Sequence, residues 1–342
     1  MRRLASLLGA LLLVPALPLS FLSVTTPVST VGFLYVIGAV LVVGGLLSAP
    51  LRIKKYRGIT RAGFALLIAT AAFRITTAAH GTTLSMTRGA SNAPTLDRLL
   101  PESDVAITSA RAVILTGMLP ANDTKNLVST LRRSYLAMDA AEGSYPSPIV
   151  MTSLNLQKKA GFDTLVISAP VPNSHSAVLF LHGYGGNFTL QCWMVAQAAR
   201  KANAATYCPS TRMWGDWWRG DGPQITRDVL ANLKANGFDR IVLAGLSNGG
   251  LGASQLAPSL RGKIVGLLLI SGAMNDALPS GVPTITFEGN DDTMMPPAIV
   301  REYAENTGAT YIELPGTHFL LIEKAAVMTD KMGTWLTARF AR

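Results

Sequence analysis

A long stretch near the N-terminus carries no charged side chain: no Lys, Arg, Asp or Glu occurs from Leu4 to Leu51. One membrane-spanning helix needs about 20 consecutive apolar residues, so this stretch is long enough for two such helices and a turn. The segment Ser23–Thr30, which contains proline and several hydroxyl side chains, breaks the apolar pattern and predicts the turn. The two spans are then expected at Leu4–Val24 and Val31–Leu51.

The basic charge of the chain is concentrated around this stretch. The formal net charge is +10, yet residues 1–74 hold eight Lys and Arg and no acid, while the other 22 basic residues are nearly balanced by all 20 Asp and Glu. A nucleic-acid-binding domain carries its basic residues on a folded face, so we expect no nucleic-acid partner. Arg2 and Arg3 precede the first span, and a basic cluster from Arg52 to Arg61 follows the second, which favours the cytoplasm for both groups.

A third apolar segment, Ala62–Phe73, leaves undecided on which side of the membrane the following residues lie. It is short for a span, but it would cross if the helix continued to about Ala79 with Arg74 reaching the interface; the alternative is a segment that lies in the membrane surface. A cleaved signal peptide competes with this interpretation, but no Ala-x-Ala-like site follows the first apolar run. We therefore expect an uncleaved anchor of two or three transmembrane helices over residues 1–80.

Residues 81–146 are expected to form a linker and an N-terminal helical extension. Ser91–Pro101 is polar and contains proline, which is typical of a linker. Apolar residues recur at helical spacing in Asn122–Ala141, and Asn122 or Asp123 is the expected capping residue of this helix.

From residue 147 to the C-terminus, short apolar runs alternate with helical segments. This pattern predicts an α/β domain over residues 147–342, with a mainly parallel sheet and helices on both faces. The expected strands are Ile149–Leu154, Thr164–Ser168, Ala177–Leu181, Ala205–Cys208, Arg240–Ala244, Val265–Ile270, Thr284–Phe287 and Thr310–Glu313. The expected helices are Thr189–Ala202, Ile225–Asn236, Gly249–Leu256, Pro297–Asn306 and Leu320–Arg339. Chemistry in such sheets gathers at the carboxyl ends of the strands.

The segment Gly245-Leu246-Ser247-Asn248-Gly249 lies between an expected strand and an expected helix. In this Gly-x-Ser-x-Gly pattern the serine occupies a very tight turn, which lifts its hydroxyl above the sheet. Glycine on either side lets the strand and the helix approach without a side-chain collision. The pattern predicts Ser247 as a nucleophile; the alternative is a serine that caps a helix at a phosphate-binding turn.

A serine hydroxyl needs a base to accept its proton, and the base needs a carboxylate to orient it. In a strand–turn–helix layout the order along the chain is serine, acid, histidine. Of the four histidines only His318 follows Ser247, in a loop after the last expected strand. Asp292 is the preferred acid because it follows the penultimate strand directly, with Asp291 as the close competitor and Asp276 as the third candidate.

With these motifs in this order, residues 147–342 resemble the α/β-hydrolase superfamily. The motifs are His182-Gly183-Tyr184-Gly185-Gly186, the Ser247 turn, Gly289-Asn290-Asp291-Asp292 and Gly316-Thr317-His318. The resemblance implies an α/β-hydrolase fold with an eight-stranded, mostly parallel sheet. It also implies a catalytic triad of Ser247, Asp292 and His318.

The same resemblance implies an oxyanion hole made by the backbone N–H groups of Tyr184 and Asn248. Many relatives insert a helical lid between the sixth and seventh strands, whereas only Ser271–Val282 separate them in this chain. We therefore expect an open site. A serine at the turn also argues against the dehalogenases and epoxide hydrolases of the superfamily, which carry aspartate there.

Four apolar side chains are candidates for the substrate pocket, with ordinary packing as the alternative for each. Trp214, Trp217 and Trp218 cluster after the fourth expected strand, and Met294 stands beside the expected acid. His182 is expected to brace the oxyanion loop rather than to act in catalysis.

Cys192 and Cys208 lie toward the same edge of the expected sheet, so a bridge is geometrically conceivable. A bridge would favour an oxidising compartment and a third membrane crossing; two separate buried thiols are the preferred interpretation. No nucleotide-binding loop follows a strand and no Cys/His cluster has ligand spacing, so we expect neither a cofactor nor a metal.

Together these features predict a membrane-anchored serine hydrolase that cleaves an ester or related acyl bond through an acyl-enzyme. A small-molecule ester or a lipid is the expected substrate. The alternatives are an acyltransferase that uses the same serine, and a hydrolase-like, membrane-bound binding protein without catalysis.

Overall fold

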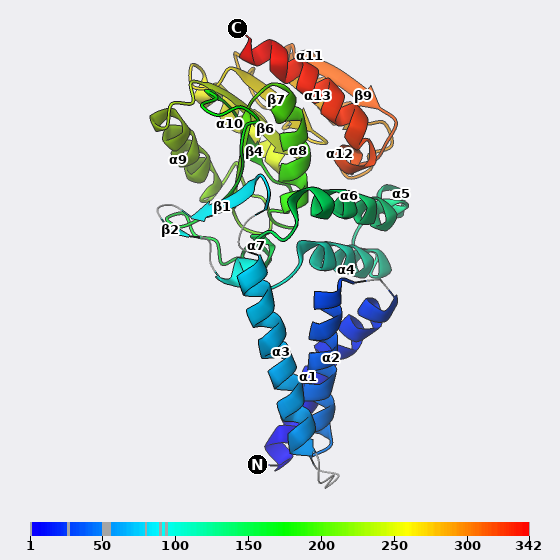
Figure 1. The fold of residues 1–342 in the computed structure, drawn as a ribbon. Helices are drawn as coiled ribbons and strands as arrows, with labels where there is room; N and C mark the ends of the chain where they lie inside the picture. The colour runs from blue at the N-terminus through cyan, green and yellow to red at the C-terminus, as the bar shows by residue number, and fades with distance from the viewer. Residues whose placement is uncertain are drawn as a thin grey trace. The chain divides into compact units, whose positions relative to one another are not determined.

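A computed structural model describes residues 2–25, 28–49, 56–78, 81–88, 91–92 and 95–341. The chain divides into two compact units: Met1–Ala79 with Arg98–Met118, and His80–Asp97 with Leu119–Arg342. The first unit is helical, and the second is a sheet covered by helices (Figure 1).

The first unit contains α1 (Arg2–Thr25), α2 (Thr30–Leu47), α3 (Tyr56–Thr77) and α4 (Glu102–Leu115). Among the described residues, α2 and α3 are long and apolar enough to cross a membrane, by length and composition. α1 and α2 correspond to the two expected spans, except that residues 50 and 51 lie outside the described residues. α3 extends beyond the expected third segment, Ala62–Phe73, at both ends and includes Arg74.

The helices of this unit are held by close packing and by a cap. A Cβ atom at Gly63 on α3 would lie 2.7 Å from the backbone nitrogen of Val42 on α2, so a larger residue would separate the two helices. At the start of α2 the hydroxyl of Ser29 accepts the N–H of Gly32 at 3.1 Å and donates to the carboxylate of Asp104 on α4 at 2.6 Å. The first bond satisfies a backbone donor that the first turn of a helix leaves free, and the second holds the capping hydroxyl in place.

The second unit is built on a nine-stranded sheet with the order β2-β1-β3-β5-β4-β6-β7-β8-β9. The strands are β1 (Leu84–Arg88), β2 (Ser91–Asn92), β3 (Asp163–Ile167), β4 (Ser176–Leu181), β5 (Ala205–Pro209), β6 (Arg240–Leu246), β7 (Gly266–Ile270), β8 (Thr284–Gly289) and β9 (Thr310–Leu314). β1 pairs antiparallel with β2 and β3, β3 pairs antiparallel with β5, and the other pairs are parallel. Apart from the two-residue β2, these are the eight mostly parallel strands of the α/β-hydrolase fold, and the predicted fold class is confirmed.

The predicted first strand was wrong. Ile149–Leu154 holds a short helix, α7 (Ile149–Ser153), and the outer full-length strand of the sheet is β1 instead. A short buried apolar run has the same hydrophobic pattern in a strand and in a helix, so periodicity does not distinguish them. Because β1 pairs with β3 along its whole length, the sheet begins within residues 81–146 and not at residue 147.

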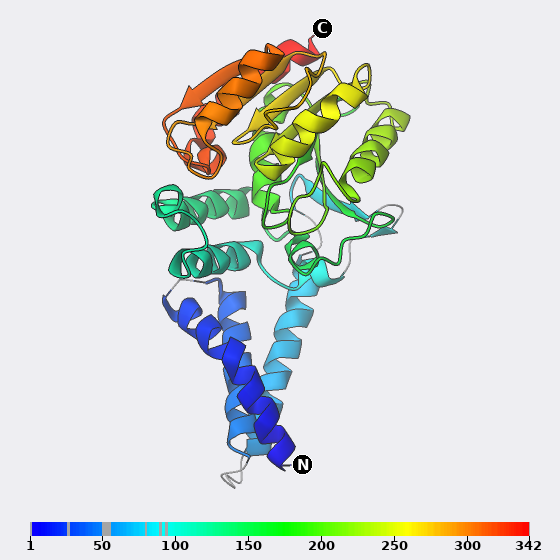
Figure 2. The ribbon, with the colours of Figure 1, turned by 180° about the vertical axis from the view of Figure 1, so that it is seen from behind.

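Helices cover both faces of the sheet (Figures 1 and 2). One face is covered by α8 (Thr189–Lys201) and α13 (Ala325–Phe340), and the other by α9 (Gly222–Ala235), α10 (Asn248–Leu256) and α11 (Pro297–Thr307). The shorter elements are η1 (Thr95–Arg98), α5 (Ala121–Thr124), α6 (Leu127–Glu142), η2 (Ala257–Leu260) and α12 (Leu320–Glu323). β4 and β7 are buried along their whole length, which explains their unbroken apolar sequences.

A buried carboxylate ties the helical extension to the edge of the sheet. Glu142, the last residue of α6, accepts the N–H of Thr83 at 2.8 Å and of Leu84 at 3.1 Å. It also accepts the hydroxyl of Thr83 at 2.7 Å. Of the segment expected to be a linker and extension, the parts before Arg98 and after Met118 therefore belong to the second unit, whereas Arg98–Met118, with α4, belongs to the first.

The two cysteines are joined. Cys192 on α8 and Cys208 on β5 form a disulfide with a Cα–Cα distance of 6.0 Å. The preferred interpretation of two separate thiols was wrong, because the start of α8 returns to the end of the neighbouring strand.

Candidate active site

Ser247 occupies a strained turn between β6 and α10. Its φ is 53° and its ψ is −119°, a backbone conformation that non-glycine residues rarely adopt. The turn depends on two glycines, because a Cβ atom at Gly245 would lie 2.2 Å from the carbonyl oxygen of Gly249, and one at Gly249 would lie 1.9 Å from the carbonyl oxygen of Leu181. The sequence pattern thus corresponds to a real steric requirement, and the serine side chain stands half-buried at the end of the strand.

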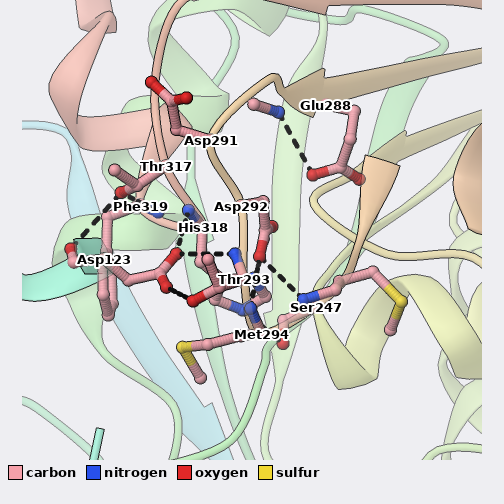
Figure 3. Close-up of polar contacts among 12 residues, drawn as sticks. Asp123, Ser247, Glu288, Asp291, Asp292, Thr293, Met294, Thr317, His318 and Phe319 are labelled. Atoms are coloured by element: carbon pink, nitrogen blue, oxygen red, sulfur yellow. Dashed lines mark hydrogen bonds and ion pairs between the residues drawn. The ribbon is translucent and has the colours of Figure 1, made fainter. Parts of the chain in front are cut away.

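A continuous chain of hydrogen bonds joins Ser247, His318 and Asp292 (Figure 3). The hydroxyl oxygen of Ser247 lies 2.9 Å from Nε2 of His318, and Nδ1 of His318 lies 2.7 Å from Oδ2 of Asp292. The histidine and the aspartate are buried. A carboxylate at Nδ1 holds the proton on that nitrogen and leaves Nε2 free to accept the hydroxyl proton.

The same geometry distinguishes the two neighbouring aspartates. Oδ1 of Asp292 accepts the N–H groups of Met294 at 2.8 Å and of Met295 at 2.7 Å, which orients Oδ2 toward His318. Asp291 is exposed, and its carboxylate points away from the imidazole (Figure 3). Only Asp292 of the two contacts His318.

A third carboxyl group, that of Glu288, lies at the end of β8 and is fully buried. Oε1 accepts the N–H of Gly289 at 3.1 Å, and Oε2 has no partner among the described residues. Burial, followed by the nearby carboxylate of Asp292, raises the pKa of Glu288 to about 10. The group is therefore protonated at neutral pH.

The loop after β4 lies directly against the serine turn. A Cβ atom at Gly183 would lie 3.2 Å from the Cβ atom of Ser247, so the following residue, Tyr184, starts beside the hydroxyl. Asn248 is the first residue of α10, where backbone N–H groups have no intrahelical acceptor. Neither the N–H of Tyr184 nor that of Asn248 donates a hydrogen bond within the described part of the chain.

His182 braces this loop in the neutral form. It is completely buried, and burial lowers its pKa to about 4. Nε2 accepts the N–H of Thr211 at 3.2 Å, so Nδ1 carries the proton that it shares with the carbonyl oxygen of Gly183 at 2.8 Å. His182 makes no hydrogen bond to the Ser247 chain, in agreement with the structural role expected for it.

The four candidate pocket residues have different environments. Trp217 is fully buried and donates from Nε1 to the carbonyl oxygen of His182 at 2.8 Å, so its indole packs in the core of the second unit. Trp218 is half-buried and packs under the guanidinium of Arg219. Trp214 is 48% exposed and stacks at a tilt on the ring of Tyr184, with 5.2 Å between ring centroids.

Trp214 and Met294 are the candidates that border the serine turn and the acid. The carbonyl oxygen of Trp214 accepts the side-chain amide of Asn248 at 2.7 Å, which joins the tryptophan loop to α10. Met294 is half-buried, and its N–H orients Asp292. All residues between β7 and β8 are described and none is helical, so no helical lid is inserted there.

Sequence reasoning missed Asp123. It was expected to cap a helix, but it lies on α5, is fully buried, and hydrogen-bonds to Thr293 and His318 (Figure 3). No local signal marks it, because both partners lie more than 150 residues later in the chain.

Within the described ranges, no group of three or more His, Cys, Asp or Glu could hold a metal ion.

No family model and no curated protein matches the chain. Among solved structures it is similar to a predicted CIB-like hydrolase from Thermoplasma acidophilum, at 18% identity over 53% of this chain and 96% of that one, with a TM-score of 0.44. It is similar to Est1E from Butyrivibrio proteoclasticus at 16% identity over 53% and 96% of the two chains, with a TM-score of 0.46. It is also similar to a monoacylglycerol lipase from Paleococcus ferrophilus at 14% identity over 52% and 99%, with a TM-score of 0.45. These similarities concern the fold alone.

Proposed function

We propose that the protein is a membrane-anchored serine hydrolase that cleaves carboxylic esters or related acyl bonds. The observation that carries the proposal is the unbroken chain of hydrogen bonds from Asp292 through His318 to Ser247, at a strained turn that follows the carboxyl end of the interior strand β6. Strain of this kind persists where the surrounding structure imposes it, and it is concentrated at functional sites.

In this mechanism the Ser247 hydroxyl attacks the substrate carbonyl while Nε2 of His318 accepts its proton. Asp292 keeps the imidazole oriented and stabilises its charged form. The backbone N–H groups of Tyr184 and Asn248 donate to the oxygen that becomes negative, and such donors contribute about 3–4 kcal/mol each. His318 then protonates the leaving group, and a water molecule activated by the same imidazole releases the acyl group.

We further propose that the N-terminal helices anchor the enzyme with its catalytic unit in an oxidising compartment. α2 and α3 have the length and composition of membrane spans. If α1, α2 and α3 all cross, Arg2–Arg3 and the basic segment Arg52–Arg57 both lie on the cytoplasmic side, as positively charged flanks do, and the rest of the chain lies opposite. The Cys192–Cys208 disulfide supports this side, because disulfides persist in oxidising compartments.

Two substrate classes fit this site: a small-molecule ester and a lipid ester delivered from the membrane. Half-exposed Ser247, with no helical insertion between β7 and β8, has access to water, which favours hydrolysis over acyl transfer. The complete hydrogen-bond chain disfavours a non-catalytic binding protein, which would not need one. An acyltransferase would give more transferred product than acid when an alcohol competes with water.

Labelling with a fluorophosphonate probe tests the proposal on the full chain in detergent. We expect wild type to be labelled and Ser247→Ala to be unlabelled. Ser271→Ala is the matched control: Ser271 also has a positive φ, 48°, and follows the neighbouring strand β7, and this variant should label as wild type does. A series of p-nitrophenyl esters of increasing chain length then separates short-ester from lipid substrates. Labelling or hydrolysis that survives Ser247→Ala would refute the assignment.

The membrane side has its own test. A C-terminal reporter that is active only outside the cytoplasm is expected to be active when fused to the full chain. Activity of a cytoplasm-specific reporter instead would contradict the third crossing and leave the hydrolase proposal untouched.

A further inference from the structure

Asp123 is a buried carboxylate outside the Ser247–His318–Asp292 chain. It lies on α5, in the segment that precedes β3, and its exposure is zero. A buried carboxylate is strongly unfavourable unless other groups hydrogen-bond to it. The groups that satisfy Asp123 therefore indicate what it does.

Its partners belong to the two loops that carry the acid and the base. Oδ1 accepts the backbone N–H of His318 at 3.0 Å and of Thr293 at 3.3 Å. Oδ2 accepts the hydroxyl of Thr293, the residue that directly follows Asp292. The main-chain carbonyl oxygen of Asp123 also accepts the hydroxyl of Thr317 at 3.3 Å. One residue thus joins the two loops, as Figure 3 shows.

The other bonds between these loops lie nearer to the strands. The N–H of Asn290 donates to the carbonyl oxygen of Leu314 at 3.0 Å, and that of Asp291 donates to Gly316 at 2.9 Å. These bonds continue the pairing of β8 with β9 and end before the catalytic groups. Beyond them, Asp123 contacts the backbone of His318 itself and the residue after Asp292.

We infer that Asp123 is a positioning residue that sets the distance between the acid loop and the base loop, and through it the Asp292–His318 contact. The inference rests on the proposed function, because it assigns Asp123 a part in the same reaction. The segment before β3 therefore has two roles. It supports the edge of the sheet, and it positions the acid and the base of the active site relative to each other. Displacements of about 1 Å in such constellations can lower the rate about 100-fold.

Kinetics of full-length variants test the inference, with p-nitrophenyl acetate as the substrate and rates normalised to fluorophosphonate-titrated sites. Asp123→Ala removes all three acceptor contacts and is expected to lower kcat about 100-fold while KM changes less than threefold. Asp123→Asn keeps an acceptor for both N–H groups, and its amide can donate to the Thr293 hydroxyl. We expect it to retain at least ten times the kcat of Asp123→Ala.

Glu142 offers a matched control in the same extension. Like Asp123, it is a buried carboxylate that accepts two backbone N–H groups and one threonine hydroxyl, but its partners are Thr83 and Leu84 beside β1. Glu142→Ala is expected to lower the melting temperature and to leave kcat per titrated site within twofold of wild type. The comparison separates positioning from general stability.

Thr293→Val covers the case in which Asp123→Ala fails to fold. It removes the hydroxyl contact and keeps the N–H contact, and we expect a kcat about tenfold below wild type with KM unchanged. The inference is overturned if folded Asp123→Ala has the same kcat as Glu142→Ala. It is also overturned if Thr293→Val has the same kcat as Glu142→Ala. An Asp123→Asn variant as slow as Asp123→Ala overturns it too. In each of these cases wild-type activity that depends on Ser247 still supports the hydrolase proposal. Activity that does not depend on Ser247 would instead contradict both the hydrolase proposal and the role of Asp123.

Discussion

Replacing Glu288 with glutamine should change how the stability of the second unit depends on pH. The carboxyl group is fully buried, its Oε2 has no donor opposite it among the described residues, and burial with nearby Asp292 raises its pKa to about 10, against 4.5 for an unperturbed group. The native state therefore holds a proton that the unfolded chain releases above about pH 4.5. Glutamine has nearly the same shape as the protonated acid and does not titrate.

The direction and size of the effect follow from proton linkage. Because the pKa is raised on folding, the stabilising contribution is complete below about pH 4.5 and is lost as the pH rises toward 10. Each pH unit in this window lowers the free energy of unfolding by about 1.4 kcal/mol. Between pH 6 and pH 8, Glu288→Gln should therefore gain about 3 kcal/mol relative to wild type.

Urea unfolding followed by tryptophan fluorescence measures this difference. All five tryptophans lie within residues 193–335, so the signal reports the second unit of the full chain. Glu313→Gln is the control: hydrogen bonds from Tyr311 and Arg301 lower the pKa of Glu313, so its contribution is already complete above its unfolded value and should be constant from pH 6 to 8. A wild-type minus Glu288→Gln difference that does not change with pH would refute the reasoning.

Three further predictions concern the same unit. Asp292→Asn should lower kcat about 10⁴-fold, while Asp291→Asn stays within about twofold of wild type, in steady-state hydrolysis of p-nitrophenyl acetate. Replacing Cys192 and Cys208 with alanine should lower the free energy of unfolding in urea by about 3 kcal/mol, because the bridge closes a loop with a sequence separation of 16; reduction of wild type should have the same effect. Trp217→Ala should lower that free energy by about 3–5 kcal/mol, because the buried indole also bonds to a backbone carbonyl; a change in KM with unchanged stability would contradict its place in the core.

The parts of the site that could be predicted are those with local steric causes. The turn at Ser247 needs glycine two residues before and after it, because side chains there would meet backbone atoms at about 2 Å. In a strand–turn–helix layout of this kind the acid and then the base follow the serine along the chain. Strands such as β4 and β7 were also predictable, since burial on both faces requires an unbroken apolar run.

Other features depend on which distant segment lies next to a residue. The apolar run at Ile149 fits a strand as well as a helix. Only the pairing of β1 with β3 shows that β1, and not this run, forms the strand beside β3. Trp217 lies in the loop after β5, and its sequence position does not show that its indole turns inward to the carbonyl of His182. The disulfide likewise requires α8 to return to the end of β5.

The buried carboxyls around Asp292 illustrate the same limit at the level of electrostatics. Asp123 and Glu288 are both acidic and fully buried, yet their surroundings differ. Asp123 receives three donors, two N–H groups and one hydroxyl. Glu288 receives a single N–H and faces a second carboxyl group, and these surroundings favour the neutral acid. The environment of each acid is therefore determined by the donors and neighbouring groups that the fold brings to it, so a count of acids along the sequence cannot assign their roles.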